Sequence, residues 1–118
     1  MVRRQMEEDR DLEEFIAKVA NSFVKIELIK FFYRNPHFLG KTGDISLAIG
    51  RNPKQISKGI DDLVVQGVIQ KKSGQKNAAI WSYAPEESMH KMITQFINAY
   101  EGPDLRQWIV NQVIRGGK

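Results

Sequence analysis

The sequence predicts a single α+β domain that is mainly helical and carries one small β-hairpin. Two observations predict this class: apolar residues recur at helical spacing in six segments, and two short β-prone runs flank one polar turn. A length of 118 residues with 42% hydrophobic content is enough for one core and short for two. We therefore expect residues 1–118 to form one domain, in the order helix, helix, helix, helix, strand, strand, helix, helix.

The N-terminal part of the chain, residues 1–21, predicts an amphipathic helix over residues 9–20. Its apolar positions recur at helical spacing: Leu12, Phe15, Ile16 and Val19. Ser22 is a suitable N-cap for a second helix over residues 23–34, which is apolar almost all round and is therefore expected at the centre of the fold. Asn35 and Pro36 end it, because the residue before proline resists the helical conformation.

The predicted core over residues 22–84 continues with two helices joined by a tight turn. The first covers residues 42–49, and its expected inner face is Ile45, Ala48 and Ile49. Gly50 suits a left-handed helix end, while Asn52 and Pro53 suit the N-cap and first position of a helix over residues 53–66. That second helix is expected to bury Ile56, Ile60, Leu63 and Val64 and to end at Gly67. Residues 42–66 thus form a helix-turn-helix, which projects the outer face of its second helix.

A β-hairpin and two further helices are expected in the remaining chain. Residues 68–71 and 79–83 are β-prone, and residues 72–77 between them are polar, so residues 68–83 predict the hairpin. Within residues 85–118, Pro85 is expected at the first position of a helix, which Gly102 and Pro103 separate from the last one. The expected apolar faces are Met89, Met92, Ile93, Phe96, Ile97 and Tyr100, then Leu105, Trp108, Ile109 and Val113.

The net charge of +4 is concentrated in one stretch of the chain. Residues 51–76 hold six basic side chains and two acidic ones, and six minus two equals the whole excess. The basic residues there are Arg51, Lys54, Lys58, Lys71, Lys72 and Lys76, and the acidic ones are Asp61 and Asp62. A local positive field of this kind favours a polyanionic partner. The alternative is chance clustering on a solvated surface.

The predicted helix-turn-helix indicates which residues meet DNA. In such motifs the N-terminal part of the second helix enters the major groove, where lysine and glutamine suit base edges. The predicted DNA-binding residues are Arg51, Asn52, Lys54, Gln55, Ser57, Lys58, Lys71, Lys72 and Lys76. Among them, residues 54, 55, 57 and 58 approach the major groove, and Arg51 with the three hairpin lysines anchors phosphates.

These assignments have plainer alternatives. The lysines of the helix and of the hairpin are alternatively a solvated surface, and Arg51 alternatively only stabilises the end of the preceding helix. Asp62 lies one turn beyond Lys58, where it can neutralise that lysine. Arg3 and Arg4 are expected to form a frayed end, with a basic arm into the minor groove as the alternative.

A resemblance to a known family covers residues 23–83. The stretch DISLAIGRNPKQISKGIDDLVVQGVIQKKSGQKNAAIWSYAP resembles the winged-helix DNA-binding domain of bacterial and archaeal transcription regulators of the broad MarR-like and ArsR-like kind. The resemblance implies a recognition helix at residues 53–66 and a wing at residues 71–77. It also implies dimerisation through the N-terminal helix and the helices from Glu86 onward. Asp61 and Asp62 depart from the pattern, because they bring negative charge to the outer half of the recognition helix.

Other functional classes find little support in the sequence. The absence of cysteine excludes disulfides and thiolate metal sites, and His37 and His90 are isolated, so we expect neither a metal nor a cofactor. Without a nucleophile–base set or a glycine-rich phosphate loop, we expect no enzyme. No apolar run approaches the roughly 18 residues of a membrane span, and residues 1–11 lack the apolar part of a secretory signal. We therefore expect a cytoplasmic protein without a membrane partner.

The sequence thus predicts a transcription regulator that binds double-stranded DNA as a homodimer through its terminal helices. The alternative is a winged-helix module that docks onto another protein in a larger assembly, which Asp61, Asp62 and the apolar terminal helices favour. RNA binding has less support, because no aromatic platform alternates with the basic residues. No operator and no small-molecule effector can be identified from the sequence.

Overall fold

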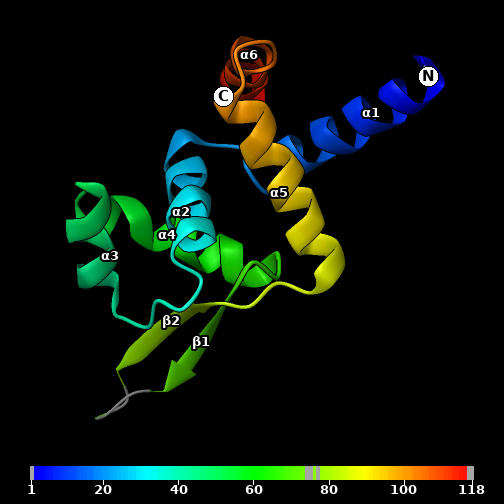
Figure 1. Ribbon diagram of the computed structural model, residues 1–118. Coiled ribbons are helices and arrows are strands. Elements are labelled where there is room, and N and C mark those ends of the chain that lie inside the picture. Colours follow the sequence, from blue (N-terminus) through cyan, green and yellow to red (C-terminus); the bar gives the residue numbers. More distant parts are fainter. Residues whose placement is uncertain (1, 74–75, 77, 117–118) are drawn as a thin grey trace.

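The computed structural model describes residues 2–73, 76 and 78–116 (Figure 1). Over these residues it contains six helices and one two-stranded antiparallel sheet. The elements are α1 (Val2–Lys18), α2 (Phe23–Arg34), α3 (Thr42–Ile49), α4 (Pro53–Val65), β1 (Ile69–Ser73), β2 (Ala79–Tyr83), α5 (Glu87–Glu101) and α6 (Arg106–Gly116). This confirms the predicted class, mainly helical with a small hairpin, and the predicted order of elements.

Helix α2 lies at the centre of the fold, as its apolar sequence predicts. Its fully buried side chains are Ile26, Leu28, Ile29 and Phe32. The hydroxyl of Ser22 accepts a hydrogen bond from the Lys25 backbone N–H at 3.2 Å, which confirms the predicted N-cap. Because α2 packs against α3, α4, α5 and β2, it connects the two halves of the core.

Helix α3 ends at Gly50 as predicted, but its inner face differs from the expected one. Gly50 adopts the left-handed conformation with φ 71°, and its N–H donates to the Ser46 carbonyl at 2.9 Å. Ile45 and Ser46 are buried, whereas Ala48, which was expected to face inward, is exposed. Ser46 turns inward because its hydroxyl donates to the Arg51 carbonyl, so a polar contact with the turn replaces an apolar one.

A reciprocal pair of hydrogen bonds sets the start of α4. The Asn52 side-chain oxygen accepts from the Lys54 N–H at 2.8 Å, and the Gln55 side-chain oxygen accepts from the Asn52 N–H at 3.0 Å. Pro53 is the first helical residue, where its missing N–H costs nothing. After the helix, Gly67 has φ 81° and turns the chain into β1. The predicted bounds are therefore correct to within one residue.

The hairpin is attached to the start of α3 through one tryptophan. In the antiparallel register Lys71 lies opposite Trp81. The Trp81 indole N–H donates to the Thr42 hydroxyl at 3.0 Å, and its backbone N–H donates to the Gly40 carbonyl at 2.8 Å. With only 7% of Trp81 exposed, these bonds fix the base of the hairpin against the helices. Residues 74, 75 and 77, which fall in the predicted turn, lie outside the described residues.

Helices α1, α5 and α6 pack together as the second half of the core. The rings of Phe15 and Phe96 lie 5.3 Å apart, and Ile109 and Val113 of α6 are buried. In Figure 1 the N-terminal half of α1 extends away from the rest of the chain. None of the helices in the described part of the chain is long and apolar enough to cross a membrane.

Helix α1 starts earlier than predicted. It begins at Val2 rather than at residue 9, so Arg3 and Arg4 lie within the helix and not in an extended arm. The added residues are mostly arginine, glutamine, methionine and glutamate, which favour helix by propensity. They lack the apolar periodicity on which the prediction depended.

Helix α5 starts later than predicted. Glu86 is the N-cap and Glu87 the first helical residue, so Pro85 precedes the helix instead of opening it. The Ala84 N–H donates to the Val68 carbonyl at 3.1 Å, which extends the pairing of the two chain segments beyond β2. This bond holds the chain extended up to Ala84 and moves the helix start by two residues.

Candidate nucleic-acid interface

One row of side chains on α4 faces outward. Residues 54, 58, 61 and 65 follow at intervals of four, three and four, so they lie along one side of the helix, which we call the outer row. All four of its side chains are exposed: Lys54, Lys58, Asp61 and Val65. The opposite side carries the buried residues Ile56, Gly59, Ile60 and Leu63. The predicted base-contacting residue Ser57 is exposed on the flank of the outer row.

Two of the predicted DNA-binding residues have a structural task at the helix start. The side-chain oxygens of Asn52 and Gln55 both accept backbone hydrogen bonds there. Both residues are nevertheless exposed, beside Lys54. Asn52 and Gln55 therefore fix the first turn of α4 and with it the position of Lys54, independently of any contact with a partner.

Arg51 forms a bidentate ion pair with Glu27 of α2. Its Nε and Nη2 atoms donate to the two Glu27 carboxylate oxygens, each at 2.8 Å. The hydrogen bond from Arg51 lowers the pKa of Glu27, and the same bond raises the pKa of the Arg51 guanidinium. The pair ties the turn between α3 and α4 to the central helix. Its predicted role as a phosphate anchor stays a prediction, while Glu27, the only acid in α2, is a contributor that the sequence analysis missed.

Asp62 pairs with Lys25 and not with Lys58, the partner that the helical spacing indicated. Its carboxylate forms an ion pair with Lys25 of α2 at 2.9 Å, and the Lys25 ammonium also donates to the Asn21 side-chain oxygen at 2.9 Å. Lys25 is only 8% exposed. Beside this pair the two helices come close at Gly59, where an added Cβ would lie 3.0 Å from a Leu28 methyl group. Asp62 thus neutralises a buried lysine and leaves Lys58 free of that partner.

The hairpin presents three exposed lysines, Lys71, Lys72 and Lys76. Lys71 lies opposite Trp81 and Lys72 opposite Ile80, so the two adjacent side chains leave opposite faces of the hairpin. Lys76 has a left-handed φ of 56°. In Figure 1 the hairpin extends away from the helices, so its lysines are carried out from the body of the molecule. The structure therefore places the ammonium groups of Lys71 and Lys72 on opposite faces of the hairpin.

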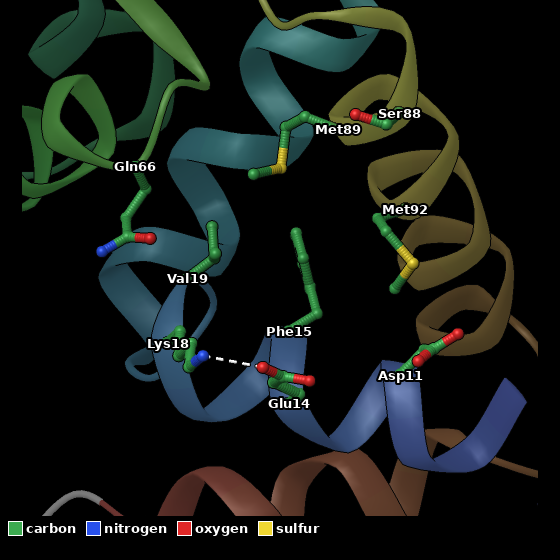
Figure 2. Close-up of a pocket in the computed structure, with 9 residues that line it drawn as sticks. All are labelled: Asp11, Glu14, Phe15, Lys18, Val19, Gln66, Ser88, Met89 and Met92. Atoms are coloured by element: carbon green, nitrogen blue, oxygen red, sulfur yellow. Dashed lines mark hydrogen bonds and ion pairs between the residues drawn. The ribbon is translucent and has the colours of Figure 1, made fainter. Parts of the chain in front are cut away.

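A groove of about 410 Å³ lies between α1 and α5 and reaches the end of α4 (Figure 2). Its apolar lining consists of Phe15, Val19, Met89 and Met92. At the rim Lys18 pairs with Glu14 at 2.7 Å, and the hydrogen bond from Lys18 lowers the Glu14 pKa. Gln66, the residue that follows α4, and Ser88 of α5 also line the groove. Its lining holds neither a histidine nor a cysteine.

Of the two histidines, His90 lies against two tyrosines. The Nδ1 atom of His90 lies 2.8 Å from the Tyr83 hydroxyl, and the imidazole stacks on Tyr33 with centroids 5.8 Å apart. Burial raises the pKa of Tyr83 to about 12. Across the described residues no three histidine, cysteine, aspartate or glutamate side chains are grouped to hold a metal ion.

No family model matches the chain, and comparison with curated proteins and with solved structures finds no match either. Evidence on function therefore comes from the charges and contacts of α4 and the hairpin.

Proposed function

We propose that this protein is a cytoplasmic DNA-binding transcription regulator of the winged helix-turn-helix type, without catalytic activity. In this proposal α4 is the recognition helix and the hairpin is the wing. The observation that carries it is the charge left on this surface after internal pairing. Among the described residues, the groups of this surface without an ion-pair partner are Lys54, Lys58, Lys71, Lys72 and Lys76, with Asp61 as the one acid, because Arg51 and Asp62 pair with α2. A surface with this balance favours the phosphate backbone of DNA.

The way α4 is held supports the same function. Asn52 and Gln55 close its first turn, and the Arg51–Glu27 pair holds the preceding turn against α2. A surface that is already ordered loses less conformational entropy when it binds. In the proposed complex Lys54, Ser57 and Lys58, with the amide group of Gln55, approach base edges in the major groove. Arg51 and the three hairpin lysines supply the phosphate contacts beside it, with Lys71 and Lys72 contributing from opposite faces of the hairpin.

We also propose a homodimer in which the terminal helices α1, α5 and α6 make the interface. The support is apolar surface on α6: Ile114 is 62% exposed, and Trp108 is only partly covered. Ile114→Glu is therefore expected to shift a concentration-dependent dimer toward monomer in sedimentation equilibrium. Leu39→Glu is the matched control, because Leu39 is also an exposed apolar residue, at 61%, but lies in the loop before α3. A monomer at every concentration would contradict the dimer and leave DNA binding to be judged separately.

The first experiment is binding of the full chain to mixed-sequence duplex DNA, followed by fluorescence anisotropy from about 50 to 200 mM salt. Binding through phosphates weakens with a log–log slope of about −0.9 for each phosphate neutralised. The charge reversal Lys54→Glu is expected to weaken binding and flatten the slope by one to two contacts. The matched control is Lys91→Glu on α5, whose lysine is 73% exposed. Absence of binding at the lowest salt, or equal effects of the two reversals, would contradict the proposed interface.

The second candidate is a docking module for another protein. The observation in its favour is exposed apolar surface on helices α3 and α4. Leu47 of α3 is 86% exposed, and Val65 of α4 is 81% exposed. If this function holds, Leu47→Ser and Val65→Ser abolish partner binding, and the wild-type chain shows no salt-dependent affinity for DNA. If the first function holds, Leu47→Ser leaves the anisotropy curve unchanged.

A further inference from the structure

Asp61 is the one acidic side chain in the outer row of α4. Its neighbour Asp62 is accounted for by the ion pair with Lys25. Asp61 is exposed, and no lysine or arginine among the described residues forms an ion pair with it. An unpaired carboxylate on a surface that otherwise carries lysines is repelled by every phosphate. Its place therefore has to be explained by something other than general affinity for DNA.

The position of Asp61 in the outer row indicates what it faces. When a recognition helix lies in the major groove, its outward side chains meet base edges, chiefly those of its N-terminal part. Asp61, the ninth of the 13 residues of α4, continues that row into the second half of the helix. Asp61 follows Lys58 by three residues, about 4.5 Å along the helix axis at 1.5 Å per residue. Base pairs are spaced by about 3.4 Å. Lys58 and Asp61 are therefore neighbours in the outer row, and we infer that their ammonium and carboxylate groups reach neighbouring base edges.

The chemistry of a carboxylate then selects the base. In the major groove only cytosine N4 and adenine N6 donate hydrogen bonds, and the adenine donor stands beside the N7 acceptor, which repels a carboxylate. Cytosine is thus the preferred contact for Asp61. Its partner guanine presents O6 and N7, both acceptors, to which a lysine donates. The two opposite charges of Lys58 and Asp61 match the acceptor and donor edges of a G·C pair.

We propose that Asp61 is a specificity-determining residue that accepts a hydrogen bond from cytosine N4. The guanine of the same G·C base pair then faces Lys58. This inference depends on the proposed DNA-binding function. The acceptor atoms of thymine and guanine repel the Asp61 carboxylate, which excludes these bases at that position. Asp61 therefore disfavours wrong sequences as well as favouring the right one. The lysines supply affinity, and Asp61 makes it dependent on sequence.

The test is selection of bound sequences from a random duplex library by the full-length protein and its variants. The wild type is expected to select a motif with one cytosine column, favoured by about 5-fold or more over other bases at that position. Asp61→Asn is expected to move this column to adenine, because an amide pairs with adenine N6 and N7. Asp61→Ala is expected to lose the preference while binding mixed-sequence DNA more tightly. Asp104→Ala, at an exposed carboxylate in the turn between α5 and α6, is the control and leaves the motif unchanged.

The outcomes separate this inference from the function on which it depends. If the wild type selects a motif that Asp61→Asn and Asp61→Ala leave unchanged, the specificity role is wrong and DNA binding stands. If the wild type selects no motif and does not bind DNA, the proposed function fails and this inference fails with it. Thermal melts of the Asp61 variants equal to that of the wild type show that a changed motif does not come from misfolding, as expected for an exposed side chain.

Discussion

The ion pair between Arg51 and Glu27 allows a quantitative test of how the turn before α4 is held. Hydrogen bonds to charged groups contribute about 1.5–3 kcal/mol, whereas exposed ion pairs contribute about 0–1 kcal/mol. The two side chains are 30% and 38% exposed, so solvent screening places this pair between those ranges, at about 1 kcal/mol. Arg51→Met is therefore expected to lower the free energy of unfolding by about that amount and the Tm by about 4 °C.

A double-mutant cycle isolates the pair from other effects of each substitution. Arg51→Met, Glu27→Gln and the combined variant are unfolded in urea at pH 7, and the coupling free energy is expected to be about 1 kcal/mol. Lys91 and Glu87 provide the control pair, at 3.5 Å with side chains 73% and 85% exposed, for which little or no coupling is expected. A coupling below about 0.3 kcal/mol for Arg51 and Glu27 would refute the view that this pair holds the turn.

The pH dependence of the same pair has a definite sign. Its hydrogen bond lowers the pKa of Glu27 below the ordinary 4.5. A carboxyl whose pKa falls on folding stabilises the fold above its unfolded-state pKa, and this contribution is lost as the pH falls through the folded-state pKa. The coupling is therefore expected in full at pH 7 and should disappear as the pH falls below 4.5. Urea unfolding of the wild type and Glu27→Gln at pH 7 and pH 3 measures it, and an unchanged difference would contradict the assignment.

Three further outcomes follow from single contacts. Burial raises the pKa of Tyr83 to about 12, so stability should fall as the pH rises from 10 towards 12, because the unfolded chain loses this proton first; Tyr83→Phe should remove that part of the loss in urea unfolding. Thr42→Val leaves the buried Trp81 N–H without its acceptor and should cost about 1–2 kcal/mol in urea unfolding, against almost no cost for Thr94→Val if buried indole satisfaction is the cause. Gly50→Ala, at φ 71°, should cost about 1 kcal/mol, and Gly50→Asn less; equal losses would argue against left-handed strain.

Signals that are local in the chain predicted the structure best. The glycine at position 50 and the Asn52–Pro53 step each act within a few residues, and the ends of α3 and α4 follow them. The start of α1 was missed because its first part has helical propensity without an apolar stripe. Ala48 was placed inward by apolarity alone, although Ser46 occupies the inner side through its bond to the Arg51 carbonyl.

The candidate site could be predicted only in part, because its charges are sorted by contacts between distant residues. Arg51 and Glu27 are 24 positions apart, and Lys25 and Asp62 are 37 apart, from 62 minus 25. The spacing along one helix indicates Asp62 as a partner for Lys58. It contains no information on α2, which packs closely against Gly59 and so brings Lys25 to Asp62. The exposed lysines were identifiable from the sequence. The ion pairs that neutralise Arg51 and Asp62, and so leave these lysines without an acidic partner, were not.

The internal pairing changes the character of the surface without changing its net charge. Residues 51–76 begin with six basic and two acidic groups, and removing Arg51 and Asp62 leaves five lysines and Asp61, again an excess of four. The electrostatic attraction to a polyanion is thus retained, while the only acid that remains stands in the outer row. The salt dependence of binding and the sequence preference should therefore respond to different substitutions. A lysine removed from the hairpin should flatten the salt dependence by about one phosphate and leave the selected motif alone. Asp61→Ala should alter the motif and leave the slope nearly unchanged, and a protein in which both quantities moved together would contradict this separation.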